Sequence, residues 1–93
     1  MLEAAGAKNI QTYDRNHTAP GNHNHEMGGA RMGRDSKTSV LNGWNQCHDI
    51  PNLFVTDGAC MASSANQNPA LTFMALTARA THYAVDQLKT ASL

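Results

Sequence analysis

Residues 51–72 read PNLFVTDGACMASSANQNPALT, an apolar run followed by a small, polar loop and a helix start. The run 53–56 is apolar without clear alternation, which favours a strand buried on both faces, as in a parallel sheet covered by helices. Asn68 stands where an N-cap is preferred, and Pro69 at the first helical position, where its missing N–H costs nothing. We therefore expect half of an α/β unit, an α+β fragment with a short buried strand before a long C-terminal helix.

The segment 69–89 has helical spacing. Its apolar residues recur three, four and seven positions apart and form a stripe at Leu71, Met74, Ala78, Val85 and Leu88. His82 lies three residues before Val85 and flanks this stripe, so we expect it to be structural. The spacing predicts a helix over 69–89 with this stripe packed.

The first third of the chain carries weaker signals. Residues 2–8 are compatible with two helical turns, and residues 16–24 form a polar loop rich in Asn and His. Residues 25–34, HEMGGARMGR, are predicted to be an irregular strand or a Gly-rich turn. They lack the glycine spacing and the Lys-Ser/Thr ending of phosphate-binding loops.

Composition points to a piece of a larger protein. Leu, Ile, Val and Phe number 14 of 93 residues, about 15%, whereas ~20% already marks the poor end for globular chains. The net charge is 0, with 7 basic and 7 acidic residues, so the chain has no electrostatic footprint for nucleic acid. We also expect no membrane span, because no run approaches the ~18 apolar residues that one needs. The N-terminus lacks the pattern of a secretory signal, and the compartment stays undetermined.

The histidines and cysteines allow a metal alternative. His23 and His25 are two residues apart, and Cys47 could complete a small metal-binding domain with them. No CxxC or HxxxH spacing supports such a site, so we expect no metal. Cys47 and Cys60 allow one disulfide, and nothing fixes a base near Cys47 as a nucleophile. The remaining loop histidines, His17 and His48, are expected on the surface.

Three motifs in series are more specific than any of these features. They are HEMGGARMG at 25–33, NLFVTDG at 52–58 and NPALT at 68–72 with the Ala-rich helix behind it. Together they resemble the C-terminal segment of the glucose–methanol–choline (GMC) family of FAD-dependent oxidoreductases, in the branch of sugar and sugar-acid dehydrogenases. The resemblance implies a domain over 25–93, with strand 53–56, a flavin-facing loop 57–68 and helix 69–89. Residues 1–24 carry no family mark and are left as a helix and polar loop.

The resemblance also implies site residues. His25 would accept the hydroxyl proton of a sugar or polyol while hydride leaves for flavin N5, and neutral imidazole is available for this near pH 7. Asn68 would hydrogen-bond the same substrate oxygen; its alternative role is simple N-capping. Asp57 and Gly58 would approach the FAD, Gly58 because a Cβ would hold the chain away. The helix start, Asn68, Pro69 and Ala70, would face the flavin and favour its anionic reduced form.

The Gly-rich FAD fingerprint of the family is absent from these residues. The expected partner is therefore the N-terminal FAD-binding portion of a parent enzyme, and the isolated chain should bind FAD weakly or not at all and be inactive. A second hypothesis is a non-catalytic module that binds a partner protein through its Ala-rich helix.

Overall fold

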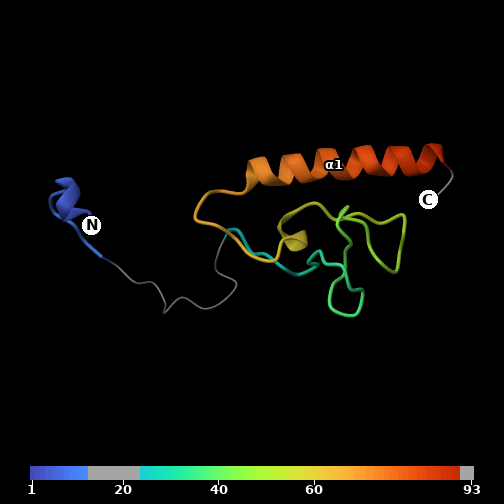
Figure 1. Cartoon of the computed structure of the whole chain (residues 1–93), viewed down its shortest axis with the longest axis horizontal. Helices are drawn as coiled ribbons and strands as arrows, with labels where there is room; N and C mark the ends of the chain where they lie inside the picture. Colours follow the sequence, from blue (N-terminus) through green and yellow to red (C-terminus); the bar gives the residue numbers. More distant parts are fainter. Residues whose placement is uncertain (13–23, 91–93) are drawn as a thin grey trace.

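The structure, a computed structural model, describes residues 1–12 and 24–90. The regular elements of these residues are two short 3-10 helices, η1 (Glu3–Ala5) and η2 (Gly58–Cys60), and one α-helix, α1 (Ala70–Lys89). Between residues 24 and 69 the chain is mostly irregular and lies along one side of α1 (Figure 1). Within the described ranges, no helix is both long and apolar enough to cross a bilayer.

The long C-terminal helix predicted from the apolar spacing is confirmed. α1 has 20 residues and begins at Ala70, one residue later than predicted. At its end, the Thr90 hydroxyl donates to the carbonyl oxygens of Asp86 and Gln87 at 3.2 and 3.0 Å. The Thr90 N–H also donates to the Asp86 carbonyl oxygen, at 3.2 Å, so Thr90 satisfies carbonyl groups at the end of the helix.

The predicted α/β character is confirmed only in part, because the described residues contain little strand. Phe54 makes one antiparallel bridge, to Gln46, where the sequence predicted a buried strand over 53–56. The Val55 N–H donates to the Asn45 carbonyl oxygen at 3.0 Å, yet Leu53 is 44% exposed. A run that is apolar on both faces needs strand neighbours and covering layers, and among the described residues it has one bridge partner, Gln46.

The N-terminal helical segment is shorter in the structure than predicted. The two helical turns expected over residues 2–8 reduce to the single turn η1, which Gly6 ends with φ of 83°. Residues 1–12 are all exposed. Most of the predicted polar loop, residues 16–23 with His17 and His23, lies outside the described residues.

The core is small, and most of its residues belong to the irregular segment. Leu41 and Cys60 are fully buried, Cys47 is nearly so, and five partly buried apolar residues pack around them: Ala30, Met32, Val55, Met61 and Leu76. Since α1 contributes only Leu76 to this cluster, most of the core comes from the loops.

The predicted apolar stripe of α1 does not pack in this chain. Leu71, Met74 and Leu88 are 79%, 69% and 64% exposed. The loops instead cover a different face of α1, whose half-buried or buried residues are Phe73, Leu76, Ala80, Tyr83, Ala84 and Gln87. The helix is thus apolar on two faces. The irregular segment has too few apolar residues to cover both of them.

Arg79 ties α1 to the irregular segment. Its Nη2 donates to the Gly43 carbonyl oxygen at 2.8 Å and to Asn45 Oδ1 at 3.1 Å. The guanidinium lies 5.7 Å from the ring centroid of Trp44, and Trp44 stacks on Tyr83 with ring centroids 4.9 Å apart. Asn45 is fully buried. Arg79 therefore donates a hydrogen bond to a buried side-chain oxygen and also links α1 to the irregular segment.

We expect Arg79→Met to lower the free energy of unfolding by about 1–3 kcal/mol, because Asn45 Oδ1 would be left buried without this donor. Lys89→Met is the matched control, since Lys89 is an exposed cation on the same helix whose Nζ lies 3.6 Å from the exposed carboxylate of Asp86; its effect should stay within about 0.5 kcal/mol. Urea unfolding followed by helical circular dichroism measures both. Equal shifts for the two variants would contradict the proposed link.

Candidate active site

His25 borders a cavity shared with the loop that precedes α1. The cavity measures about 440 Å³ and is lined by Asn24, His25, Glu26 and Ser64. His25 is exposed. The imidazole is thus accessible to a small molecule in a space bounded by the first motif and by the loop between the second and third motifs. Sequence reasoning did not single out Ser64, because one serine in a loop of small residues carries no signal of its own.

Backbone hydrogen bonds hold the His25 motif against η2. The N–H groups of Gly28, Ala30 and Met32 donate to the carbonyl oxygens of Gly58, Ala59 and Cys60 at 3.3, 2.9 and 2.9 Å. Two motifs that are about 30 residues apart therefore run side by side. This arrangement fixes the backbone just after His25.

Asp57 begins η2 as its N-cap. Its Oδ1 accepts a hydrogen bond from the Ala59 N–H at 3.0 Å, and the residue is exposed. The carboxylate therefore shapes the turn in which Gly58 stands. Contact of Asp57 or Gly58 with a cofactor stays a prediction.

The start of α1 differs from the sequence prediction in its capping. Pro69 occupies the N-cap position, and the cap makes no side-chain hydrogen bond. Pro69 is buried and Asn68 is exposed. The prediction that Asn68 caps the helix, with Pro69 as the first helical residue, is therefore wrong. Asn68 does not line the cavity of His25, and its catalytic role stays a prediction.

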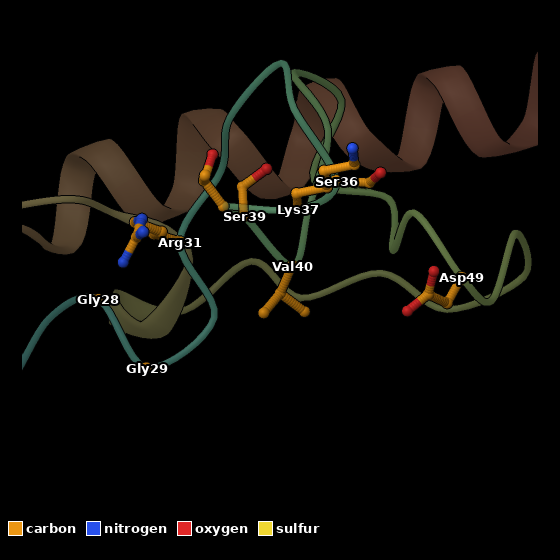
Figure 2. Close-up of a pocket in the computed structure, with 9 residues that line it drawn as sticks. Gly28, Gly29, Arg31, Ser36, Lys37, Ser39, Val40 and Asp49 are labelled. Carbon is orange, nitrogen blue, oxygen red and sulfur yellow. The ribbon is translucent and has the colours of Figure 1, made fainter.

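A separate cleft of about 350 Å³ lies beside the Gly-rich part of the first motif (Figure 2). Its lining comprises Gly28, Gly29, Arg31, Ser36, Lys37, Thr38, Ser39, Val40 and Asp49. It shares no lining residue with the His25 cavity. It is therefore a second surface feature of the irregular segment.

His48 contacts Ser39, one of the residues that line this cleft, and has a structural role. Its Nε2 is 3.2 Å from the Gly33 carbonyl oxygen and 3.1 Å from Ser39 Oγ, while the Ser39 hydroxyl donates to the Asp35 carbonyl oxygen at 2.7 Å. Since a carbonyl oxygen only accepts, Nε2 carries the hydrogen and His48 cannot take a proton from Ser39 there. The pair is not a nucleophile and base. The expectation of a surface residue is corrected, because His48 is half-buried.

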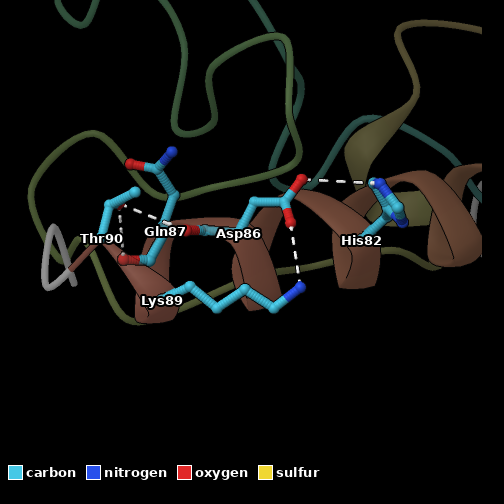
Figure 3. A network of polar contacts seen from close by, with 5 residues as sticks. All are labelled: His82, Asp86, Gln87, Lys89 and Thr90. Atoms are coloured by element: carbon cyan, nitrogen blue, oxygen red, sulfur yellow. Dashed lines mark hydrogen bonds and ion pairs between the residues drawn. The ribbon is translucent and has the colours of Figure 1, made fainter.

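His82 is exposed on α1, contrary to the expectation that it flanks a packed stripe. Its side chain is 85% exposed, and Nε2 lies 3.5 Å from Asp86 Oδ2. Lys89 Nζ lies 3.6 Å from the other oxygen of the same carboxylate (Figure 3). Exposed pairs at this spacing contribute little to stability, so His82 has neither a packing role nor a place in the cavity.

Both cysteines are buried and free. Burial raises the pKa of the Cys60 thiol above its ordinary value, and the Asp57 carboxylate adds to this, against a hydrogen bond with Asn45. Cys60 is therefore held as a neutral thiol in the core. In the part of the chain that the structure describes, no three His, Cys, Asp or Glu residues gather as a metal site would require; His23 of the metal alternative lies outside that part.

Comparison with known proteins identifies what the chain resembles. A family model described as GMC oxidoreductase matches residues 2–77. The match includes the His25, Asp57-Gly58 and Asn68 motifs and begins well upstream of residue 25, in a region where sequence reasoning found no family mark.

Several curated proteins are similar to the chain. It is 40% identical over 84 residues to 2-methyl-1,2-propanediol dehydrogenase of Mycolicibacterium austroafricanum, covering 89% of the chain and 15% of that protein. It is 44% identical over 66 residues to the fructose dehydrogenase large subunit of Gluconobacter japonicus, covering 71% and 12%. It is 42% identical over 53 residues to the gluconate 2-dehydrogenase flavoprotein of Pantoea cypripedii, covering 57% and 9%. The chain spans less than a sixth of the length of each of these proteins.

Proposed function

Because the chain belongs to the GMC oxidoreductase family, we propose that it is the C-terminal part of an FAD-dependent oxidoreductase that oxidises a CH–OH group of a sugar or polyol. The observation that carries this proposal is the cavity in which His25 and Ser64 meet, inside the matched region. The names of the similar proteins support the substrate class, since two act on fructose or gluconate and one on a diol.

His25 is the proposed general base. Its exposed imidazole borders a cavity of about 440 Å³, which leaves room for a hydroxyl group at hydrogen-bond distance. A neutral ring nitrogen would accept the hydroxyl proton as the C–H bond beside it breaks. FAD, when bound, would supply the electron acceptor for the hydride.

Asn68 is the proposed second contact of the reacting oxygen. A carboxamide cannot accept the proton, but its NH₂ can donate to the oxygen and stabilise the negative charge that develops there. The exposed position of Asn68 supports this role, and so does the N-cap position of Pro69, because Asn68 is then not the capping residue of α1.

The start of α1 fits an anionic group. α1 has 20 residues, and its N-cap makes no side-chain hydrogen bond, so the first N–H groups are left to an outside acceptor. A helix N-terminus of this kind favours negative charge. We propose that Asn68, Pro69 and Ala70 face the flavin, with Asp57 near the cofactor from the η2 turn.

The partner in this proposal is the N-terminal FAD-binding portion of the same enzyme. The apolar side chains of Leu71, Met74 and Leu88 are exposed on α1. We propose that the FAD-binding portion covers this apolar surface in the enzyme. We call the chain joined to or assembled with this portion the complete enzyme. The hypothesis of a separate helix module rests on the same exposed face and has no observation of its own.

We expect the isolated chain not to bind FAD in a titration at micromolar concentration, because residues for the FAD pyrophosphate and ribose lie outside it. The complete enzyme should contain one FAD and reduce an artificial electron acceptor with sugars or polyols. Fluorescence titration and an assay over a panel of both classes measure these outcomes. Stoichiometric FAD binding by the isolated chain, or a complete enzyme that turns over no alcohol, would contradict the proposal.

A further inference from the structure

We infer that Gly58 is a positioning residue that couples the His25 segment to α1, an inference that rests on the proposed function. A Cβ placed on Gly58 would lie 2.8 Å from the Glu26 carbonyl oxygen, 3.0 Å from Met27 Sδ and 3.3 Å from Phe73 Cζ. The two nearest atoms belong to the residues that directly follow His25, and the third belongs to the first turn of α1. The first two motifs and the first turn of α1 therefore meet at one α-carbon.

The backbone conformation does not explain the glycine. Gly58 is not among the residues with positive φ, whereas Gly6 and Gly28 are. Any residue could adopt its conformation, so the requirement is one of space. The closest atom, at 2.8 Å, is a backbone oxygen and cannot rotate away as a side-chain end could.

The space beside Gly58 is filled by this chain itself. If the glycine served only to let a cofactor approach, the direction of its Cβ would be open before the cofactor is added. Instead that direction holds the backbone just beyond His25 and the ring of Phe73. The Gly28 N–H also donates to the Gly58 carbonyl oxygen, at 3.3 Å, which joins the same two segments. Gly58 thus sets how closely the His25 segment approaches the η2 turn.

A methyl group at residue 58 would displace the segment that carries His25. Contacts near 2.8 Å need a shift of several tenths of an ångström, and misplacement of a catalytic group by about 1 Å can cost about 100-fold in rate. In the complete enzyme, we expect Gly58→Ala to keep its FAD and its KM but to lose about 10- to 100-fold in kcat.

Trimming Phe73 should restore part of that loss. Phe73→Leu removes the ring atom nearest the new methyl group, so the methyl group can move towards α1 and away from the Glu26 oxygen. We expect Gly58→Ala with Phe73→Leu to recover several-fold in kcat. Gly43→Ala is the matched control, because a Cβ there meets nothing within 4 Å, and its kcat should equal that of the unmodified enzyme.

The measurements are FAD content, KM and kcat of these variants, together with the deuterium isotope effect on flavin reduction. Loss of FAD from Gly58→Ala without rescue by Phe73→Leu would overturn the inference in favour of a direct cofactor contact. A kcat equal to that of Gly43→Ala would overturn it as well. If instead the unmodified complete enzyme oxidises no alcohol, the proposed function itself fails, which is a different result.

A second variant covers the case in which Gly58→Ala does not accumulate as folded protein. Met27→Ala removes the flexible side chain between Gly58 and the His25 segment and leaves all backbone contacts in place. We expect it to retain FAD and to lose several-fold in kcat with an altered isotope effect. Unchanged kcat and isotope effect in Met27→Ala would overturn the inference.

Discussion

His25→Ala should slow flavin reduction in the complete enzyme by about 10²- to 10⁴-fold, the usual contribution of a general base. The substrate hydroxyl would have to lose its proton to water, while the electron acceptor stays in place. Anaerobic stopped-flow mixing with the best substrate measures the rate as the oxidised flavin absorbance disappears. The FAD content should match that of the unmodified enzyme, because His25 lies on the substrate side of the proposed site.

His82→Ala is the matched control for this variant. His82 is a histidine with its side chain 85% exposed on α1, and its removal should leave the reduction rate unchanged. The cavity beside His25 measures about 440 Å³, so free imidazole has room to replace the missing ring. Partial recovery of His25→Ala with imidazole is expected. An unchanged reduction rate in His25→Ala would remove this residue from the mechanism.

The local part of the fold was predictable from the sequence. α1 begins within one residue of the predicted position, because the run of good helix formers from Ala70 onward acts locally, although Pro69 is the N-cap and not the first helical residue. The irregular chain around the Gly-rich motif was also expected. The strand over 53–56 was not confirmed as a strand, because a strand is defined by its neighbours, and a sequence pattern cannot show whether they are present.

The predicted apolar stripe of α1 shows the limit of periodicity. The spacing of Leu71, Met74 and Leu88 indicates an apolar face, and it does form one, but the face is exposed in this chain. The covered face depends on Arg79, whose bonds to Gly43 and Asn45 span more than 30 residues. Such contacts have no local signature. Periodicity therefore located an apolar surface without showing which partner covers it.

The candidate site was predictable in its residue types and less so in its geometry. His25 was singled out through a family resemblance, and the structure places it at a cavity with Ser64. The family resemblance predicted a cofactor contact for Gly58, which stays a prediction, whereas the structure shows that a Cβ there would meet Glu26, Met27 and Phe73. A sequence indicates that a glycine is needed at a position, but only coordinates show what it approaches.

Asn68→Ala should lower kcat in the complete enzyme by about 10²- to 10³-fold, as the loss of one donor to a developing oxyanion does. The structure separates this role from helix capping. If Asn68 capped α1, its removal would cost about 1 kcal/mol of stability. Because the cap makes no side-chain hydrogen bond, we expect the unfolding transition of Asn68→Ala to stay where it is while turnover falls.

Asn66→Ala is the matched control, since Asn66 is an exposed asparagine two residues earlier in the same loop. Stopped-flow reduction, FAD content and thermal unfolding of both variants give three independent readouts. Asn68→Asp adds a further comparison, because it keeps the size of the side chain, removes the NH₂ donor and places negative charge where the oxygen becomes negative. We expect it to be at least as slow as Asn68→Ala. A stability loss with normal turnover in Asn68→Ala would assign this residue to the helix start alone and leave His25 as the sole proposed contact to the reacting oxygen.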